Sequence, residues 1–326
     1  MEKQFGHAGF RRLYAPGTLT LGLMFPVARV ERTIPDMHQQ LQIAQRAERL
    51  GFAALWARDV PLYDPAFGDV GQLYDPWVWL GAVASQTALI ALSTAGIVLP
   101  LRHPLHVAKA AASLDVITRG RFVLGLASGD RPAEYPAFGI PYHARAERFR
   151  ESFDVIRRSL HHSFPAIESS TGAFQGVDLL PKPYAGYLPS LIIGTARQTV
   201  EWIAEHADGW VTYPRDADAQ LDRIALWRQA VDKRARGRFR PFTQSLFLDL
   251  DPVKHRKPTP INLGYRVGSE YLTELLFRYQ SMGVNHVILN LRNSTRPIDE
   301  VLHELAEDVL PAFPSHVTNT LISPTK

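Results

Sequence analysis

The segment IALSTAGIVLPLRHPLHVAKAAASLDVITRGRFVLGLASGD, residues 90–130, contains one complete strand–helix–strand unit. Residues 90–99 are predicted as a strand, and Pro104 suits the first turn of a helix that continues to about residue 118. Gly120 ends this helix, and a second strand is predicted over residues 121–127. Both strands are short and apolar without alternation, which is typical of strands buried on both faces of a parallel sheet.

The same alternation continues on both sides of this segment. Further strands are predicted at 18–27, 53–57, 190–194, 209–213, 242–250 and 286–291, and further helices from 35 onward and at 77–88, 144–161, 197–207, 217–236, 269–282 and 298–310. Eight strands and eight helices favour an α/β fold, a closed (β/α)8 TIM barrel, with an open doubly wound sheet as the main alternative. We expect a single barrel domain over residues 1–326, with an N-terminal extension at about 1–16 and a short C-terminal tail at about 314–326.

Composition excludes several classes of protein. The 326 residues are 46% hydrophobic and 21% charged, which is ordinary for a globular chain and unlike disordered, collagen-like or disulfide-scaffold proteins. A net charge of +4 is too small to indicate a nucleic-acid partner. The chain has no cysteine, so it has no disulfide or thiolate site. Its first residues lack an apolar signal-peptide core, so we expect a cytoplasmic protein.

Residues 76–101 carry no charge and are long enough to span a membrane on length alone. Ser85, Gln86 and Thr87 interrupt the stretch, however, and Pro100 ends it. A buried helix that leads into a buried strand therefore fits better than a membrane span.

In a barrel of this type the loops after the carboxyl ends of the strands build the site. Three of these loops are long, at 59–75, 129–143 and 251–267, and such loops are commonly lids or binding loops. The loop at 251–267 is predicted to be mobile and cationic. Its run of charged residues is predicted to be solvated. A fourth long segment, 163–189, precedes a strand and belongs to the opposite face.

Three short segments could carry chemistry. In GTARQT, residues 194–199, Thr195 and Gln198 have the spacing of a capping box, while Arg197 beside a helix start is also suited to binding a phosphate. Gly96, Gly125 and Gly129 could let a planar ligand approach the backbone, or could simply form tight turns. His103 precedes Pro104, where a helix-start hydrogen bond is commoner than catalysis.

The chain lacks the G-x-S-x-G, H-E-x-x-H and P-loop motifs of hydrolases, zinc proteases and ATP-binding proteins. His103, Asp59, Asp130 and His255 have no paired ligand spacing, so no metal site is predicted.

Together these segments resemble the bacterial luciferase-like flavin oxidoreductases, a family of (β/α)8 barrels. The resemblance is densest over residues 94–140 and continues in IIGTARQTVEWIAEHADGWV, residues 192–211. It implies an FMN site, and a non-prolyl cis peptide at Ala95–Gly96 behind the flavin ring. The implied cofactor-binding residues are Met24, Phe25, Trp56, Ala95, Gly96, Ala127, Ser128, Asp130, Gly194, Thr195, Ala196, Arg197, Gln198 and Thr199.

Where light-emitting relatives carry an acidic residue and a histidine pair, this chain has Asp59-Val60-Pro61, so light emission is not predicted. The resemblance implies a monooxygenase or oxidoreductase that uses reduced FMN and oxygen on a small organic substrate, as a homodimer supplied by a separate flavin reductase. Candidate proton-handling or catalytic residues are His103, Asp59 and Arg102. The alternatives are a deazaflavin-dependent hydride-transfer enzyme of the same fold and a noncatalytic flavin-binding subunit.

Overall fold

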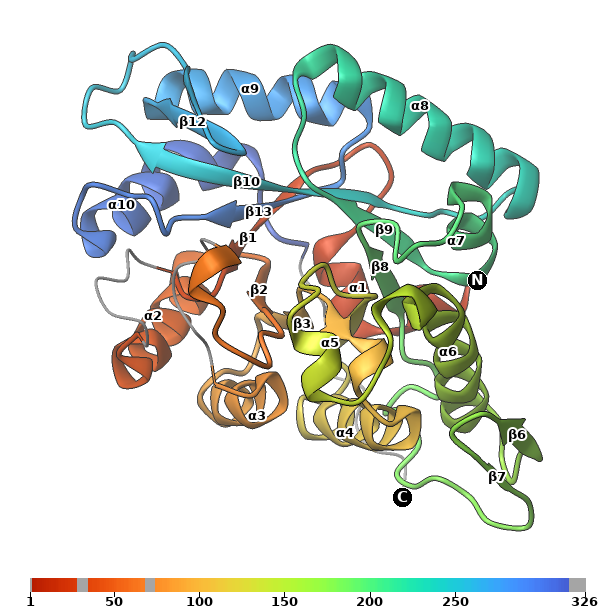
Figure 1. Cartoon of the computed structure of the whole chain (residues 1–326). Helices are drawn as coiled ribbons and strands as arrows, with labels where there is room; N and C mark the ends of the chain where they lie inside the picture. The colour runs from red at the N-terminus through yellow and green to blue at the C-terminus, as the bar shows by residue number, and fades with distance from the viewer. Residues whose placement is uncertain (1, 28–34, 68–73, 317–326) are drawn as a thin grey trace, which may run out of the picture.

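The computed structural model describes residues 2–27, 35–67 and 74–316 of the chain, and in it eight parallel strands close into a barrel (Figure 1). The barrel strands are β1 (Thr20–Met24), β2 (Ala54–Ala57), β3 (Ala91–Thr94), β5 (Phe122–Ala127), β8 (Ser190–Ile193), β9 (Gly209–Thr212), β10 (Phe242–Leu250) and β13 (His286–Asn290). They pair in that order, and the pairing of β9 with β10 and of β13 with β1 closes the ring. The predicted barrel is confirmed and the open sheet is excluded.

Helices cover the outside of the barrel, as predicted. They are α2 (Met37–Leu50), α3 (Pro76–Gln86), α4 (Pro104–Ile117), α6 (Arg145–His161), α7 (Val200–His206), α8 (Ala217–Arg234), α9 (Ser269–Met282) and α10 (Ile298–Glu304), the last continued by a π-helical turn, Leu305–Val309. Asp36 and Asp75 accept backbone N–H bonds at the starts of α2 and α3, and Gly51 ends α2 at φ +95°. The uncharged stretch is thus a helix followed by a buried strand, β3.

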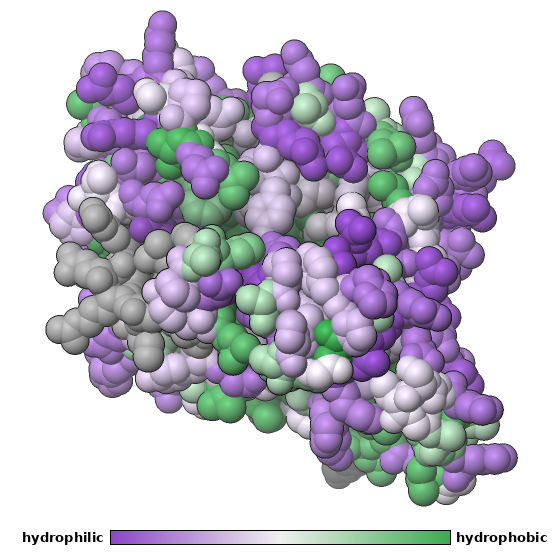
Figure 2. All heavy atoms as spheres, in the orientation of Figure 1, coloured by the Kyte–Doolittle hydropathy of each residue, from purple (hydrophilic) through white to green (hydrophobic). Residues whose placement is uncertain are grey.

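No helix among the described residues is long and apolar enough to cross a membrane. On the face shown in Figure 2, apolar residues occur in small groups between hydrophilic ones.

Two of the long segments contain hairpins that the sequence did not predict. Segment 163–189 carries β6 (Ile167–Ser169) and β7 (Gly172–Phe174), which lie beyond the end of α6 in Figure 1. Segment 251–267 carries β11 (Thr259–Ile261) and β12 (Gly264–Val267), and β12 pairs with the second half of β10. The expectation of a mobile loop is therefore wrong for 251–267, because main-chain hydrogen bonds to β10 hold it.

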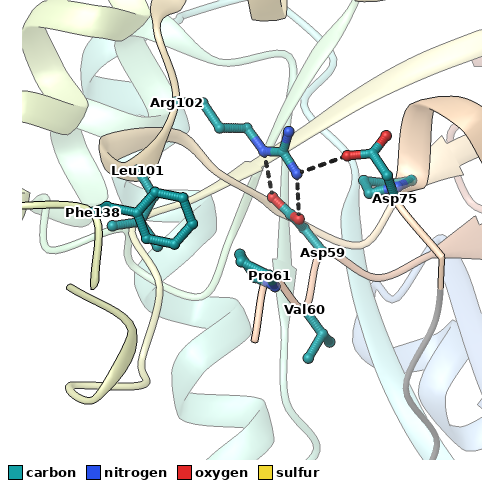
Figure 3. Close-up of a pocket in the computed structure, with 8 residues that line it drawn as sticks. Asp59, Val60, Pro61, Asp75, Leu101, Arg102 and Phe138 are labelled. Atoms are coloured by element: carbon teal, nitrogen blue, oxygen red, sulfur yellow. Dashed lines mark hydrogen bonds and ion pairs between the residues drawn. The ribbon is translucent and has the colours of Figure 1, made fainter. Parts of the chain in front are cut away.

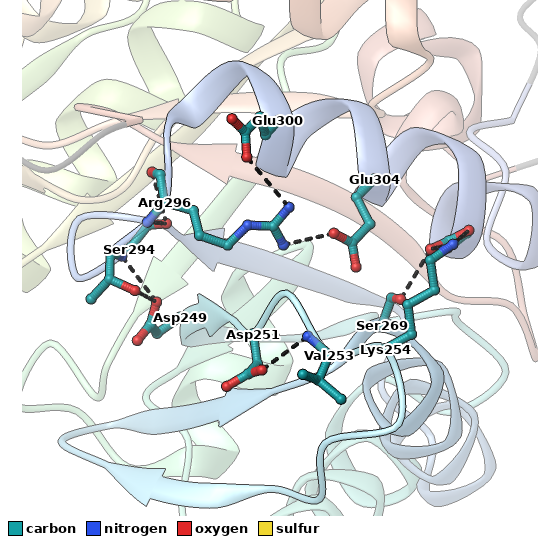
Figure 4. A network of polar contacts seen from close by, with 11 residues as sticks. Asp249, Asp251, Val253, Lys254, Ser269, Ser294, Arg296, Glu300 and Glu304 are labelled. Carbon is teal, nitrogen blue, oxygen red and sulfur yellow. Dashed lines mark hydrogen bonds and ion pairs between the residues drawn. The ribbon is translucent and has the colours of Figure 1, made fainter.

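Ion pairs and hydrogen bonds also fix this loop, and Figure 4 shows the bond from the Val253 N–H to Asp251. Lys254 lies 2.8 Å from Asp308, and Arg266 donates to Asp251 at 2.9 Å. Beside them, the loop after β13 is held to Asp249, which accepts from the Thr295 N–H at 3.0 Å. Of the charges predicted to be solvated, Lys254 is thus paired, although its side chain stays exposed.

The predicted N-terminal extension contains α1 (Ala8–Leu13), whose side chains fill the amino-terminal end of the barrel. Phe10, Leu13 and Tyr14 are buried against inward residues of the strands, and the Tyr14 hydroxyl lies 3.0 Å from Thr243 Oγ1. The lower half of the barrel interior is therefore closed by packed side chains, and space remains at the carboxyl end of the strands.

Candidate cofactor and substrate cavity

A cavity of about 560 Å³ opens at the carboxyl ends of the barrel strands. Its floor is apolar, with Met24, Ile193, Val211 and Ile288 pointing inward from four strands. The predicted site residues that line it are Met24, Asp59, Ala95, Gly96, Ala127, Ser128, Asp130, Gly194, Thr195, Ala196 and Arg197. Residues from distant parts of the sequence thus meet where a barrel of this type places its chemistry.

Small residues form one wall of the cavity. A Cβ atom on Gly96 would lie 2.8 Å from the Ala127 Cβ, and one on Gly125 would lie 1.9 Å from the Thr94 carbonyl oxygen. Larger side chains at Gly96 or Gly125 would therefore force β3 and β5 apart. The backbone at Gly96 is therefore packed closely against Ala127 at this wall of the cavity.

The expected cis peptide at Ala95–Gly96 is not present. The cis bonds among the described residues are Phe25–Pro26 and Leu180–Pro181. The chain leaves β3 instead through the positive φ of Gly96, +108°, which an L-residue rarely adopts.

The turn after β8 differs from the predicted helix start. Ala196 and Arg197 have φ values of +46° and +61°, so these residues cannot belong to the first turn of a right-handed helix. Helix α7 begins at Val200, and Thr199 caps it by accepting from the Trp202 N–H at 3.2 Å. The predicted capping box of Thr195 and Gln198 is therefore wrong.

Gln198 instead fastens this turn to α6. Its side-chain carbonyl accepts from Arg150 Nη2 at 2.8 Å, and its amide donates to the Ala146 carbonyl at 2.9 Å. Gln198 is buried and does not line the cavity. We infer that it positions the turn that presents Thr195 and Arg197.

Arg145, which the sequence did not single out, lies at the same end of the cavity. Its guanidinium stacks 3.5 Å from the Tyr142 ring centroid and donates to the Tyr142 carbonyl at 2.6 Å. Its Nε is buried and has no hydrogen-bond partner in the described chain. A buried donor of this kind indicates a missing acceptor.

The cluster of Asp59, Arg102 and Asp75 is an ion-pair network beside the cavity (Figure 3). Arg102 donates to both oxygens of Asp59, at 3.0 and 2.8 Å, and to Asp75 at 3.2 Å. Asp59 also accepts from the Val98 N–H at 2.9 Å. Burial alone would lower the pKa of Arg102. The hydrogen bonds to Asp59 and its negative charge have the larger combined effect, so the pKa of Arg102 is raised. Both side chains are held in structural contacts, which argues against the proton-handling role predicted for Asp59 and against Arg102 as a catalytic residue that contacts the flavin.

His103 lies outside the cavity. Its Nδ1 accepts from the Leu105 N–H at 3.3 Å at the start of α4, and its Nε2 lies 3.2 Å from the Thr171 carbonyl. Both ring nitrogens are used in a neutral imidazole that caps a helix. The predicted catalytic role is not supported by this position, whereas the commoner helix-start role is.

Phe25 and Trp56, predicted to flank a flavin ring, also lie elsewhere. Phe25 points to the helix side of β1, where its ring meets Trp79 edge-on. Trp56 points into the barrel but one layer below the cavity, where Nε1 donates to His286 Nε2 at 3.1 Å. Thr199 caps α7 and does not line the cavity either.

Besides Arg145, three further arginines of the cavity were missed. Arg58 follows β2, Arg131 follows β5 and Arg292 follows β13. Burial, together with the charges of Arg292 and Arg131, lowers the pKa of Arg58 to about 9. Burial and the charge of Arg131 lower the pKa of Arg292 to about 10. The position of Arg58 and Arg292 directly after predicted strands was a signal that could have found them.

The fold and this cavity define a (β/α)8 barrel enzyme with its site at the carboxyl ends of the strands. The family described as luciferase-like monooxygenase matches residues 19–248, so the chain belongs to the luciferase-like monooxygenase family, as the sequence resemblance indicated. It is a flavin-type oxidoreductase.

Among similar proteins, an uncharacterized protein of Mycobacterium tuberculosis is 32% identical over 62% of this chain and 68% of its own length. Limonene 1,2-monooxygenase of Rhodococcus erythropolis is 32% identical over 60% of this chain and 50% of its own. F420-dependent hydroxymycolic acid dehydrogenase of M. tuberculosis is 32% identical over 55% of this chain and 50% of its own length.

Solved structures share the fold at low sequence identity. A monooxygenase from Streptomyces bottropensis superposes with a TM-score of 0.76 at 18% identity, covering 90% of this chain and 99% of that one. An F420-dependent secondary alcohol dehydrogenase superposes with a TM-score of 0.74 at 18% identity, covering 91% of this chain and 100% of that one.

Proposed function

We propose that the protein is an FMN-dependent oxidoreductase that uses reduced FMN and molecular oxygen to oxygenate a small organic substrate. The observation that supports this most is a single cavity with a polar, cationic end and small residues in another part of its lining. Thr195, Arg197 and Arg145 make the polar end, and Gly96 and Ala127 belong to the wall.

The polar end suits a phosphate in its chemistry. The turn after β8, which contains the left-handed residues Ala196 and Arg197, brings Thr195 and Arg197 to the same end of the cavity. Arg197 and Arg145 add two cations, and the buried Arg145 Nε lacks an acceptor that a phosphate oxygen would provide. Thr195 adds a hydroxyl that can donate to the same group.

The remainder of the cavity suits a planar ring. Gly96 and Ala127 line it with small residues, and Met24 supplies an apolar contact from β1. Reduced FMN, when bound, would supply the electrons for oxygen activation. The chain's own contribution is to orient the ring, to exclude water with the apolar floor, and to offer polar groups at the rim.

A deazaflavin-dependent oxidoreductase is the second candidate, because the relatives at 32% identity include an F420-dependent dehydrogenase as well as a monooxygenase. A noncatalytic flavin-binding subunit is the third. We also retain a homodimer, a separate flavin reductase and a cytoplasmic location as parts of the proposal.

Titration of the purified protein with FMN, riboflavin and F420, followed by fluorescence quenching, tests the cofactor. FMN should bind more tightly than riboflavin, because only FMN carries the phosphate. Tight F420 binding with no FMN binding would replace the first candidate by the second. Absence of product from candidate substrates supplied with reduced FMN and oxygen, despite FMN binding, would favour the subunit.

A further inference from the structure

The hairpin that follows β10 brings its turn to the cavity. Asn262 and Leu263, which lie between β11 and β12, are part of the cavity lining. β12 pairs with β10, and β10 lies four strands from β3 in either direction around the closed ring (Figure 1). The turn therefore lies across the cavity from Gly96, which follows β3.

Leu263 has a strained backbone in this turn. Its φ of +58° is one that a residue with a side chain rarely adopts, and asparagine or glycine is usual at such a position. The glycine of the turn comes one residue later and has a different purpose, because a Cβ on Gly264 would lie 1.8 Å from the Phe247 carbonyl oxygen. Glycine is thus found where the turn approaches β10 closely, whereas the left-handed position is occupied by a leucine.

Packing in the hydrophobic core does not offset this strain. Leu263 is 37% exposed and, among the described residues, belongs to none of the hydrophobic core clusters. Phe247 also lies outside these clusters, and it remains half-buried although the Arg292 guanidinium lies 5.5 Å from its ring centroid. The Phe247 N–H donates to the Leu263 carbonyl at 3.0 Å, so the two residues are neighbours. Both apolar side chains therefore present surface that the described chain leaves uncovered.

The cavity lining next to Leu263 is apolar. Phe247 lines it from β10, and Ile288 lines it from β13, the strand that pairs with β10. Apolar surface of this kind in an enzyme cavity is typically covered by a ligand. Backbone strain also persists where the surrounding structure holds it, and it clusters at ligand contacts. Here the pairing of β12 with β10 holds the turn, so the strain and the uncovered surface point to a ligand at the same residue.

We propose that Leu263 is a substrate-binding residue, and that the substrate is an uncharged, predominantly apolar molecule that covers Leu263, Phe247 and Ile288. This inference rests on the proposed function, because it assigns the opposite side of the cavity, at Gly96 and Ala127, to the flavin ring. The turn keeps a leucine in spite of the strain because neither glycine nor asparagine offers an aliphatic side chain to the substrate. Leu263 is then a determinant of specificity for apolar substrates.

The first test is binding of 1-octanol and 1-butanol to the full chain, with and without FMN, measured by isothermal titration calorimetry. The two alcohols carry the same hydroxyl and differ only in the length of the apolar chain. We expect 1-octanol to bind the FMN-loaded chain at least about tenfold more tightly than 1-butanol, because each additional buried methylene group favours binding. Equal affinities for the two alcohols, or no binding of 1-octanol to the FMN-loaded chain, would overturn the proposal.

Variants at Leu263 separate contact with a ligand from a structural role. Leu263→Asn should weaken 1-octanol binding by about fivefold or more, while the FMN dissociation constant changes by less than about threefold. Its melting temperature should not fall, since asparagine adopts a left-handed backbone with less strain than leucine. Leu263→Met keeps an apolar side chain and should bind 1-octanol nearly as well as the original chain. Leu226→Asn, on the outer helix α8 and similarly exposed at 40%, is the matched control and should leave both affinities unchanged.

The outcomes separate this inference from the proposed function. If FMN binds and Leu263→Asn binds 1-octanol as tightly as the original chain, the inference fails and the FMN proposal stands. If Leu263→Asn lowers the melting temperature by more than about 4 °C, the leucine has a packing role and the inference fails. If this variant abolishes FMN binding, Leu263 holds the cofactor and the inference also fails. If FMN does not bind to the unaltered protein, the proposed function fails, and the titrations without FMN still decide whether Leu263 contacts an apolar ligand.

Discussion

The two halves of the barrel interior use the same strands in different ways. At the amino-terminal end, Trp56 and His286 pack with α1 and form a chain of hydrogen bonds. At the carboxyl end, Gly96 and Ala127 line an open cavity. The lower layer thus contributes stability and the upper layer provides space for ligands, and a substitution should affect one property with little effect on the other.

The hydrogen bonds of the lower layer determine the form of His286. Thr20 Oγ1 donates to the Leu13 carbonyl at 2.8 Å and lies 2.7 Å from His286 Nδ1, which must therefore be the protonated nitrogen. His286 Nε2 then accepts from Trp56. A second proton on the ring would meet the indole N–H, so the neutral form is required.

Truncation of the lower layer should have the largest effect. Trp56→Ala should reduce the free energy of unfolding by about 3–5 kcal/mol, because it opens a cavity and leaves His286 Nε2 without its donor. Met24→Ala, at the cavity floor, is the control. Its loss of unfolding free energy should be less than half of that caused by Trp56→Ala. Urea denaturation of both variants measures the difference, and equal losses would show that the two layers do not differ.

In the upper layer, Thr195→Glu should weaken FMN binding by about a hundredfold or more, because a carboxylate would face the phosphate. The melting temperature should change little, since Thr195 is exposed. Thr195→Ser keeps the hydroxyl and should bind FMN nearly as well as the original chain. Unaltered FMN affinity in Thr195→Glu would move the phosphate away from this turn.

The lower layer should also make stability depend on pH. Burial, with a smaller effect from the charge of His316, lowers the pKa of His286 to about 3, so between about pH 3 and 6.5 the unfolded chain binds a proton that the folded chain does not. Stability should therefore fall as pH decreases, and this residue accounts for about 2 kcal/mol between pH 7 and 5. His286→Gln should show a shallower fall over this range in denaturation curves. An identical slope in the variant would exclude the histidine as its source.

The smallest effect is expected at His103, outside both layers. His103→Ala should cost about 1 kcal/mol of stability through loss of the helix cap. His103→Asn keeps a capping side chain and should restore most of that loss, with FMN affinity and turnover nearly unchanged. A large drop in turnover in His103→Asn, with FMN still bound, would return His103 to a catalytic role.

The sequence predicted the barrel because strand and helix signals alternate along the chain and each strand of the ring is apolar. It could not show which side of a strand a residue faces, since strands buried on both sides lack alternation. Phe25 was therefore assigned to the cavity although Met24 is the inward residue. For the same reason the depth of Trp56 within the barrel was not predictable.

The predicted site was closest to the structure where small residues follow a strand, as at Gly96, Ala127 and Thr195. The start of α7 was misplaced because Thr195 and Gln198 have the right spacing for a cap, whereas the left-handed backbone of Arg197 leaves no sequence signal. The hairpin in residues 251–267 depends on pairing with β10, a contact that local sequence does not report.

The central claim is that the cavity at the carboxyl ends of the strands holds a flavin mononucleotide. A crystal structure of the complex with FMN tests it most directly. We predict phosphate oxygens within hydrogen-bond distance of Thr195 and the Arg145 Nε, and the ring against Gly96 and Ala127. FMN bound elsewhere, or with its phosphate among Arg58, Arg131 and Arg292, would contradict the account.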